Sequence, residues 1–491
     1  MTLDKRKSLA PWIKDDIEYY DHQIEGIRKL ARMKSFLLAD DMGLGKSLQA
    51  LTVFGIDVHM GLAKSAVVIC PATLKGNWID EIEHFTTFEH MELGKAYSKT
   101  GKPRAATPQE RDLQLLEFKA MTGAKILVMN YEQVQAHLKQ LQALNFDIAI
   151  FDEAHYLKNP KAKRTSACME LYTRRSFMLT GSPMLNKVDE LWPILWRIDP
   201  NTYPDYYAFK ARYCVMGGYK NKEIIGVQNE QELTMKLQSV MLRRLKDDVL
   251  KLKKPYIVKR HVDLTELQQR MYDEVLNEMR LTLPDDIDNP VDIENGMTKF
   301  LRLKQICGTT ATLTTEDSSG KLDLVMTDGL EILKNGRKLI VFTQFREVQA
   351  AYERRVFADP ELKHFPMWEL NGDVPIVNRQ DIVKAWSSHP GPAIIVCMLQ
   401  VAGIGLNMVA ARDMQFIDKL FVPKLNQQAV DRAHRIGQDE TQAVQVLEYI
   451  ARNTVEKRVE EINVTKTQLF NDVVESSAWK RMLLEEVMKG V

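Results

Sequence analysis

Two sets of short apolar runs constrain the fold of this chain more strongly than any other feature. Each run is almost continuously apolar and alternates with segments of helical spacing, which is typical of parallel strands buried on both faces of a sheet. The first set comprises residues 35–39, 66–70, 125–129, 148–151 and 176–179. The second set comprises residues 338–343, 367–370, 393–398, 414–417 and 443–450. The repeated pattern predicts an α/β fold with two parallel-sheet lobes in tandem.

The stretch between the two sets differs from them in amino-acid composition. It is rich in Lys, Glu, Gln and Met at helical spacing and contains the acidic loop LPDDIDNPVDIENG. We therefore predict helical insertions and a linker there. The expected organisation is an amino-terminal lobe over residues 1–198, the insertions and linker over 199–334, a second lobe over 335–452, and a helical segment over 453–491.

The composition is that of a globular chain with large cores, because 45% of its 491 residues are hydrophobic and 27% are charged. Lys plus Arg number 67 and Asp plus Glu number 66, so contacts with nucleic acid would have to come from local basic patches. Five cysteines lie far apart without a CxxC pair. This spacing argues against a disulfide framework or a zinc module and for a reducing compartment.

The amino-terminal residues lack the apolar segment of a signal peptide, and no run approaches the roughly eighteen apolar residues of a membrane span. These features predict a soluble chain inside the cell. We expect it to be cytoplasmic in a bacterium or a virus-infected host cell, nuclear in a eukaryote, and monomeric.

A glycine-containing loop, DDMGLGKS (40–47), follows the first apolar run and precedes a helical pattern. This strand, loop and helix order is that of a phosphate-binding loop. Gly43 and Gly45 let backbone N–H groups face a polyphosphate. Lys46 would reach its β- and γ-phosphates, and the Ser47 hydroxyl could ligate Mg²⁺.

The loop departs from the generic pattern because Asp40 stands where a glycine is usual. A glycine-rich turn capped by Lys and Ser is therefore the alternative interpretation. The predicted nucleotide-binding residues of the loop are Asp41, Met42, Gly43, Leu44, Gly45, Lys46 and Ser47.

Two adjacent acids end the apolar strand of DIAIFDEAH (147–155). Neighbouring residues at a strand end point in different directions, so Asp152 could hold Mg²⁺ while Glu153 turns towards an attacking water. A solvated acidic loop is the alternative. The phosphate loop upstream in the same lobe favours the catalytic interpretation.

These two sites belong to an ordered set of motifs: LADDMGLGKS (38–47), ICPATLKGNW (69–78), DEAHYLKN (152–159), LTGSPMLN (179–186), MLRRLKDDV (241–249), KLIVFTQF (338–345), GIGLN (403–407) and QAVDRAHRIGQ (428–438). The set resembles the superfamily-two helicases and, among them, the Swi/Snf-type DNA translocases. The resemblance covers residues 20–450, nearly the whole chain. It implies two RecA-like lobes and an enzyme that hydrolyses ATP, with Mg²⁺, to move on DNA.

The resemblance also implies roles for residues outside the loop. Gln23 resembles the glutamine that reads the adenine edge, although a plain surface glutamine is the alternative. Gly405 is expected near the nucleotide. Arg432 and Arg435 resemble the paired arginines that reach the γ-phosphate, where a planar guanidinium stabilises the charge of phosphoryl transfer. Without the HRIGQ context, surface ion pairs would be the usual interpretation of such arginines.

A further group is expected to couple hydrolysis to the second lobe. Thr180, Gly181 and Ser182 resemble the segment that senses hydrolysis, and Gln428 is assigned to the same coupling. A strand-to-helix turn is the alternative interpretation of the first three residues, and both can hold at once.

The expected DNA contacts are short polar side chains and backbone N–H groups at strand ends, which suit phosphates and carry no sequence preference. They are Thr73, Lys75, Asn77, Trp78, Asn130, Tyr131, Gln344, Asn371, Gly372 and Asn407, with the backbone of Gly405 beside them. The basic loops 99–104 and 158–164 would add electrostatic attraction or are simply solvated.

The chain departs from the family at two points. The usual Trp-Asn-Pro before the last motif is Phe421, Val422 and Pro423, and a usual double glycine is Ala402 and Gly403. These changes concern fine coupling rather than hydrolysis. The spellings DDMGLGK and QAVDRAHRIGQ resemble the branch that remodels forks and junctions more than the branch that slides nucleosomes.

Several functions fit these features. The first is a DNA-stimulated ATPase that translocates on duplex DNA and remodels branched DNA such as forks or Holliday junctions. The second uses the same motor to displace nucleosomes, polymerase or other proteins from DNA. A non-catalytic DNA-binding scaffold and an RNA helicase are the remaining alternatives, disfavoured respectively by the intact catalytic residues and by the RAHRIGQ motif.

Overall fold

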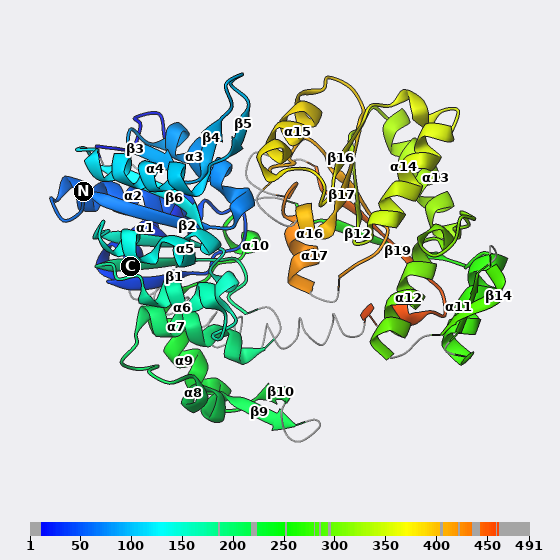
Figure 1. Cartoon of the computed structure of the whole chain (residues 1–491), viewed down its shortest axis with the longest axis horizontal. Coiled ribbons are helices and arrows are strands. Elements are labelled where there is room, and N and C mark those ends of the chain that lie inside the picture. The colour runs from blue at the N-terminus through cyan, green and yellow to red at the C-terminus, as the bar shows by residue number, and fades with distance from the viewer. Residues whose placement is uncertain are drawn as a thin grey trace. The chain divides into compact units, whose positions relative to one another are not determined.

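The structure, a computed structural model, describes residues 11–184, 187–217, 223–250, 253–278, 280–283, 286–292, 296–402, 406–420, 423–434, 442–457 and 459–460. Contacts between Cα atoms divide the chain into two compact units after Leu250. We call the described residues up to Leu250 lobe one and those from 253 onward lobe two (Figure 1).

Lobe one is built on a seven-stranded sheet in which all pairings are parallel. In sheet order its strands are β11 (Met241–Leu242), β1 (Ser35–Leu38), β8 (Arg175–Leu179), β7 (Ile148–Asp152), β2 (Ser65–Cys70), β6 (Lys125–Asn130) and β3 (Glu89–Glu92). The five inner strands coincide with the first set of apolar runs, so that prediction is confirmed. The edge strands β3 and β11 carry no apolar run of this kind.

Helices pack against this sheet. In chain order they are α1 (Asp21–Arg32), α2 (Lys46–His59), α3 (Lys75–Phe85), α4 (Pro108–Ala120), α5 (Tyr131–Gln142), α6 (Lys163–Glu170) and α7 (Trp192–Ile198). Val67 and Ile69 share one core with residues of α4 to α7. Ala66 and Val68, which alternate with these two residues along β2, are also buried. They point to the opposite face because strand side chains alternate. A strand covered on both faces explains the continuous apolar runs.

Smaller elements complete lobe one. The pair β4 (Lys95–Tyr97) and β5 (Pro103–Ala105) forms a hairpin, and β9 (Cys214–Gly217) and β10 (Glu223–Val227) form another. Helices α8 (Tyr206–Tyr213), α9 (Glu230–Val240) and α10 (Lys246–Val249) lie in the stretch expected to be insertions and linker. That stretch is therefore not purely helical, and its strand β11 is part of the main sheet of lobe one.

Lobe two contains a six-stranded sheet, again with all pairings parallel. In sheet order its strands are β12 (Tyr256–Val262), β19 (Gln445–Ala451), β18 (Asp413–Phe416), β15 (Leu339–Thr343), β17 (Ile394–Met398) and β16 (Met367–Leu370). Five of them coincide with the second set of apolar runs. The sixth strand, β12, lies in the stretch expected to be a linker. It was not predicted because it is an edge strand whose exposed residues, with Lys and Arg among them, do not resemble a buried strand.

The helices of lobe two are α11 (Glu266–Glu278), α12 (Gly296–Gly308), α13 (Gly320–Lys334), α14 (Arg346–Ala358), α15 (Ile376–Ser388), α16 (Leu399–Ala402) and α17 (Pro423–Val430). The acidic stretch expected to be a loop contains β14 (Asp286–Asp292), which pairs with β13 (Arg280–Leu283). That expectation of a loop was wrong for β14, because strand pairing there overrides the turn-forming composition.

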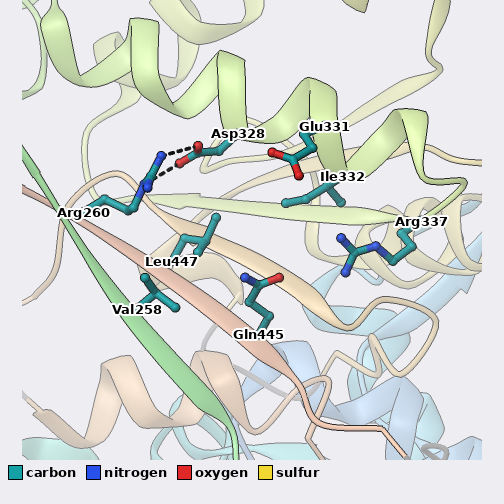
Figure 2. Close-up of a pocket in the computed structure, with 8 residues that line it drawn as sticks. All are labelled: Val258, Arg260, Asp328, Glu331, Ile332, Arg337, Gln445 and Leu447. Carbon is teal, nitrogen blue, oxygen red and sulfur yellow. Dashed lines mark hydrogen bonds and ion pairs between the residues drawn. The ribbon is translucent and has the colours of Figure 1, made fainter.

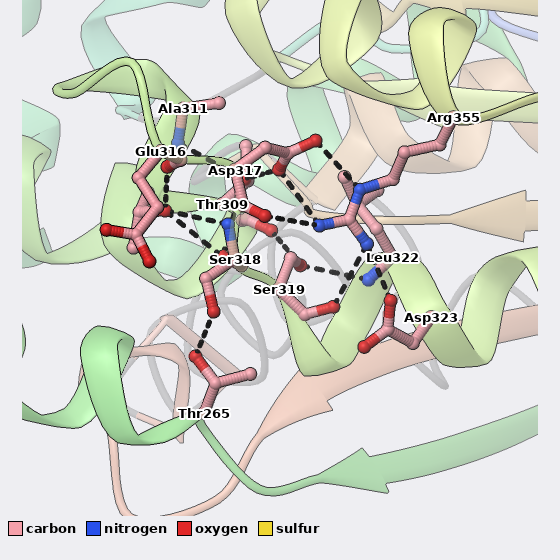
Figure 3. Close-up of polar contacts among 12 residues, drawn as sticks. Thr265, Thr309, Ala311, Glu316, Asp317, Ser318, Ser319, Leu322, Asp323 and Arg355 are labelled. Atoms are coloured by element: carbon pink, nitrogen blue, oxygen red, sulfur yellow. Dashed lines mark hydrogen bonds and ion pairs between the residues drawn. The ribbon is translucent and has the colours of Figure 1, made fainter. Parts of the chain in front are cut away.

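A polar network holds the connection between α12 and α13 against α14 (Figure 3). Arg355 on α14 donates to both carboxylate oxygens of Asp317, at 2.8 and 2.9 Å, and to Asp323 at 2.6 Å. The Thr309 hydroxyl also donates to Asp317, and Ser319 caps the first turn of α13. The connection is therefore a fixed part of lobe two.

A cavity of about 190 Å³ lies in lobe two beside β12, β19 and α13 (Figure 2). It is lined by Val258, Arg260, Asp328, Glu331, Ile332, Arg337, Gln445 and Leu447. Arg260 donates to both oxygens of Asp328, at 3.0 and 2.7 Å. No described residue of the predicted site lines this cavity.

All five cysteines are buried and free. Among the described residues, no helix has both the length and the apolar character needed to cross a membrane.

Candidate active site

The phosphate loop joins β1 to α2, and its two glycines adopt left-handed backbone conformations. Gly43 has a φ of 81° and Gly45, the N-cap of α2, a φ of 73°. A Cβ atom on Gly45 would lie 2.2 Å from the amide nitrogen of Gln23. The left-handed conformation favours glycine at position 45, and a side chain there would also displace the Gln23 amide.

Lys46 is the first residue of α2, and its ammonium group folds back over the loop. The Nζ atom donates to the backbone carbonyls of Asp40 and Asp41, at 2.8 and 3.1 Å. Burial lowers the pKa of Lys46, and the nearby carboxylates of Glu153 and Asp152 act against that shift. The ammonium group is thus held by two carbonyl oxygens, which the oxygens of a bound phosphate could replace.

Gln23 lies directly against the phosphate loop instead of on an open surface. Its side chain is 3% exposed, and its amide nitrogen donates to the Leu44 carbonyl at 3.3 Å. His22 contacts the same carbonyl at 3.1 Å. The structure therefore brings Gln23 to the loop, while its contact with adenine stays a prediction.

The two acids lie at the carboxyl end of β7. The Trp78 indole nitrogen donates to Asp152 Oδ2 at 2.9 Å, and the Tyr131 hydroxyl donates to the Asp152 carbonyl at 2.8 Å. Burial, and then the charge of Glu153, raise the pKa of Asp152 to about 7. The two acids are therefore close enough to oppose each other's ionisation.

Glu153 has a left-handed backbone conformation, with a φ of 50°, and is buried. This is an uncommon state for a residue other than glycine. Its carboxylate lies 3.2 Å from His155 Nδ1 and accepts a hydrogen bond from the Thr180 hydroxyl at 3.4 Å. The two carboxylates therefore have different partners, Trp78 for Asp152 and Thr180 for Glu153, while their roles as metal ligand and base stay predictions.

Thr180 joins this acid to the segment after β8. Besides Glu153, its hydroxyl contacts His155 Nδ1 at 3.2 Å and accepts from the Ser182 N–H at 3.0 Å. A Cβ atom on Gly181 would lie 2.9 Å from the side chain of Met42 in the phosphate loop. Because β7 and β8 are neighbours in the sheet, the predicted coupling segment touches both Glu153 and the predicted phosphate loop.

Three buried residues of this region went unassigned in the sequence: Arg243, Arg244 and Gln49. Arg244 pairs with Asp40, the residue that replaces the usual glycine, and Arg243 pairs with Asp41. The motif MLRRLKDDV contained the signal. Its arginines could not be assigned because their partners lie about two hundred residues away in the chain.

A Mg²⁺ ion was predicted to bind Ser47 and Asp152. Among the described residues, no cluster of three or more His, Cys, Asp and Glu side chains is arranged to hold a metal ion. The donor set nevertheless fits Mg²⁺, which binds one or two protein oxygens and completes its shell with phosphates and water. The half-buried Asp152 carboxylate, opposed by Glu153, is an anion that such a cation would stabilise.

The predicted DNA contacts of lobe one lie after the carboxyl ends of the neighbouring strands β2 and β6. Trp78 and Tyr131 are 1% and 0% exposed, and both contact Asp152. We therefore reassign them from DNA contact to the support of Asp152.

The other predicted contacts of lobe one are less buried. Asn130 caps α5 through its side-chain oxygen, which accepts from the Gln133 N–H at 2.8 Å. Lys75 donates to the Leu93 carbonyl at 2.8 Å and forms an ion pair with Glu92 at 3.1 Å. The Thr73 hydroxyl is buried without a hydrogen-bond partner in the described structure. Asn77 lies in the first turn of α3.

In lobe two, Gln344 follows β15, and its N–H donates to Asp418 at 2.9 Å. Asn371 is buried and its amide donates to Glu369 at 3.1 Å, whereas Gly372 has open space around its Cα. Asn407 is exposed. The exposed backbone at Gly372 is therefore more accessible to an outside partner than the buried Asn371 side chain.

The last motif is described only in part. Gln428 and Arg432 are both buried, at 4% exposure. The Gln428 amide nitrogen has no hydrogen-bond partner among the described residues. Gly405 and Arg435 lie outside the described residues, as do Gly403, Phe421 and Val422, where the chain departs from the family.

Comparison with known proteins places this arrangement in a family. The SNF2-related domain matches residues 22–312, and the helicase conserved C-terminal domain matches residues 323–437. The TATA-binding protein-associated factor mot1 of Aspergillus fumigatus is 25% identical over 93% of this chain and 27% of its own length. An ATP-dependent helicase of Mycoplasma genitalium is 28% identical over 95% of this chain and 44% of its own length.

The DNA repair and recombination protein RAD26 of Saccharomyces cerevisiae is 25% identical over 98% of this chain and 48% of its own length. The chain thus spans less than half the length of each of these relatives. A solved Sulfolobus solfataricus SWI2/SNF2 ATPase core in complex with dsDNA is 25% identical, with 96% of each chain covered and a TM-score of 0.43. Since the SNF2-related domain alone covers more than half of the sequence, the chain belongs to the SNF2-related family of helicase-like ATPases.

Proposed function

We propose that this chain is a DNA-dependent ATPase that hydrolyses ATP in lobe one and translocates on duplex DNA. One observation carries the proposal: the Thr180 hydroxyl contacts Glu153 and the Ser182 N–H. The residue assigned as catalytic base is thereby tied to the segment assigned to coupling. Ligand sites at the carboxyl ends of parallel strands are a general feature of such sheets.

The residues of lobe one have separate tasks in this proposal. Lys46 exchanges its carbonyl partners for phosphate oxygens, and Gln23 faces the adenine. Asp152 and Ser47 would hold Mg²⁺, which neutralises phosphate charge when bound. Glu153 accepts a proton from the attacking water, and the Thr180 hydrogen bond keeps its carboxylate oriented.

In this proposal, two arginines of lobe two supply further positive charge to the transferring phosphoryl group. We propose that Arg432 and Arg435 stabilise the transferring phosphoryl group, and that Gln428 transmits the change. A guanidinium group is suited to this task because it is planar, permanently charged and able to donate two parallel hydrogen bonds. Hydrolysis would then depend on the state of both lobes.

The proposed DNA contacts are made to the backbone. Thr73, Lys75, Asn77 and Asn130 would act from lobe one. Gln344, Asn371, Gly372, Asn407 and the backbone of Gly405 would act from lobe two. Lys75 must exchange its intramolecular partners, Leu93 and Glu92, for a phosphate. Contacts of this kind give affinity for DNA without recognising the base sequence.

The preferred function is the remodelling of branched DNA such as forks or Holliday junctions. The amino-acid sequences of the first and last motifs support it. Displacement of proteins from DNA is the second candidate. It is favoured by relatives named as TATA-binding protein-associated factors. Both tasks use the same motor.

The deciding experiment measures the ATPase rate with single-stranded, duplex, forked and four-way DNA and with RNA, using Lys46→Ala as the inactive control. We expect stimulation by duplex DNA and the largest stimulation by branched DNA. Equal stimulation by all duplex forms would favour the second candidate. Stimulation by RNA alone would contradict the proposal.

A further inference from the structure

Arg244 forms a buried ion pair with the residue that replaces the usual glycine of the phosphate loop. Its Nε and Nη2 atoms donate to the two carboxylate oxygens of Asp40, at 2.9 and 2.5 Å. Arg244 is 5% exposed and Asp40 is 0% exposed. This bidentate pair is the strongest form of hydrogen-bonded ion pair that an arginine makes.

The same guanidinium reaches two helices beside the loop. Arg244 Nη1 donates to the His22 carbonyl in α1 and to Glu25, the latter at 3.2 Å. Arg244 Nη2 donates to Gln49 Oε1 in α2 at 3.2 Å. Gln49 in turn donates to the loop carbonyl of Gly45 at 3.3 Å.

Arg243, the preceding residue, holds the other side of the loop. Its Nη1 donates to the carbonyls of Ala39 and Gly181, at 2.6 and 3.3 Å, and its Nη2 donates to Asp41 Oδ1 at 3.1 Å. Its side chain is 1% exposed. The two arginines therefore contact consecutive residues of the loop and the coupling segment after β8.

Asp40 and Asp41 are also the residues whose carbonyls hold the Lys46 ammonium group. The arginines thus fix the part of the loop that sets the position of Lys46. A buried ion pair contributes little net stability compared with an apolar pair of the same size. Stability alone is therefore a weak reason for charges at these positions, whereas a defined loop geometry is a sufficient one.

We propose that Arg243 and Arg244 are positioning residues for nucleotide binding, which hold Asp41 and Asp40 so that the phosphate loop and Lys46 are preformed for a polyphosphate. The proposal rests on the proposed ATPase function. It also gives a task to the segment after β11, from which the chain continues towards lobe two. Through the two arginines, that segment is hydrogen-bonded to Asp41 and Asp40 of the phosphate loop.

Lobe one contains a matched control. Arg175 forms a buried ion pair with Asp57, at 2.7 and 2.6 Å, and also donates to three backbone carbonyls. Asp57 lies near the carboxyl end of α2, whereas the phosphate loop lies at its amino end. Replacing Arg175 by Lys disturbs a comparable ion pair without touching the loop.

The test compares Arg244→Lys, Arg243→Lys and Arg175→Lys with the parent chain. We would measure the affinity for a fluorescent ATP analogue without DNA, the thermal midpoint, and kcat and KM for ATP with duplex DNA. Lysine keeps the charge but not the planar fork, so Arg244→Lys should weaken nucleotide affinity and raise KM by about tenfold or more. The kcat should change by less than about threefold.

Arg175→Lys should lower the thermal midpoint by a similar amount and leave nucleotide affinity near the parent value. Equal loss of affinity in Arg175→Lys, or parent-like affinity in both Arg244→Lys and Arg243→Lys, would overturn the proposal. Because affinity is measured without DNA, a parent chain that binds ATP but ignores DNA would contradict the proposed function alone.

Gln49→Met keeps the test decisive if Arg244→Lys does not fold. Methionine preserves the length and packing of the buried side chain but removes the amide that joins Arg244 to the Gly45 carbonyl. We expect a loss of nucleotide affinity of about threefold or more. Unchanged affinity in both Gln49→Met and Arg243→Lys would overturn the proposal.

Discussion

The indole nitrogen of Trp78 donates a hydrogen bond to Asp152 Oδ2 at 2.9 Å, although the two residues are 74 positions apart in the chain. Trp78 comes from α3, and Asp152 ends β7. This bond favours the ionised carboxylate, whereas burial and the charge of Glu153 favour the protonated one. Trp78 therefore helps to set the charge of the predicted Mg²⁺ ligand.

The first prediction concerns pH. The pKa of Asp152 is raised to about 7, and Mg²⁺ requires the ionised carboxylate. Therefore kcat/KM for ATP should rise as the pH increases through about 7. Trp78→Phe removes the bond that lowers this pKa, so its acidic limb should move to higher pH. The measurement is the pH profile of kcat/KM, with Trp192→Phe as control because that buried indole donates to the Tyr203 carbonyl instead. Superimposable profiles for Trp78→Phe and the parent would contradict this role.

A second prediction separates proton transfer from binding. Glu153→Gln keeps the shape of the side chain but cannot accept a proton, so turnover should fall by about 100-fold or more. ATP and DNA affinity should stay near the parent values. Steady-state hydrolysis and equilibrium binding check both statements. Glu132→Gln, at an exposed ion pair, is the control, and near-normal turnover of Glu153→Gln would remove Glu153 as the base.

A third prediction concerns the Thr180 hydroxyl. Thr180→Val leaves the Ser182 N–H without this partner and removes the hydrogen bond from the Thr180 hydroxyl to Glu153, so the DNA-stimulated rate should fall by roughly tenfold. Thr180→Ser should restore most of it. Thr165→Val is the matched control, because its buried hydroxyl donates to the Leu157 carbonyl. A rate loss of equal size in Thr165→Val would show a general packing effect.

A fourth prediction concerns Arg435. Arg435→Ala should leave ATP binding largely intact while hydrolysis falls by roughly three orders of magnitude, and DNA should no longer stimulate it. Arg435→Lys should rescue little, because an ammonium group lacks the planar fork. ATPase rates with and without saturating duplex DNA test this. DNA-stimulated turnover of Arg435→Ala near the parent rate would leave Arg432 as the remaining candidate.

The fifth prediction concerns DNA grip. Affinity for duplex DNA should fall steeply with salt and vary little with sequence, because the proposed contacts are made to phosphates. Competition between unrelated duplexes at fixed salt is the measurement. A strong preference for one sequence would contradict backbone binding and require a base-reading element.

The sequence alone determined the two parallel sheets and predicted the residues of a nucleotide site. Strands buried on both faces are continuously apolar, and ten strands of the two large sheets could be located from runs of this kind. The phosphate loop and the acid pair could be predicted in the same way. The residues that each motif needs lie next to one another in the sequence, after a single strand. Among the edge strands of the two large sheets, β16 was located in this way, whereas β3, β11 and β12 were not. β11 has two residues, and β12 alternates with charged ones on an exposed edge.

Only the tertiary structure decided which distant residues support the site. Arg244 and Asp40 are separated by 204 positions, and Trp78 and Asp152 by 74 positions. No local spacing links such pairs. They meet because parallel strands β11, β1, β2 and β7 bring their carboxyl ends to one edge of a sheet, whatever their distance along the chain. The order of strands in the sheet, which local pattern does not encode, therefore determined the surroundings of the predicted catalytic residues.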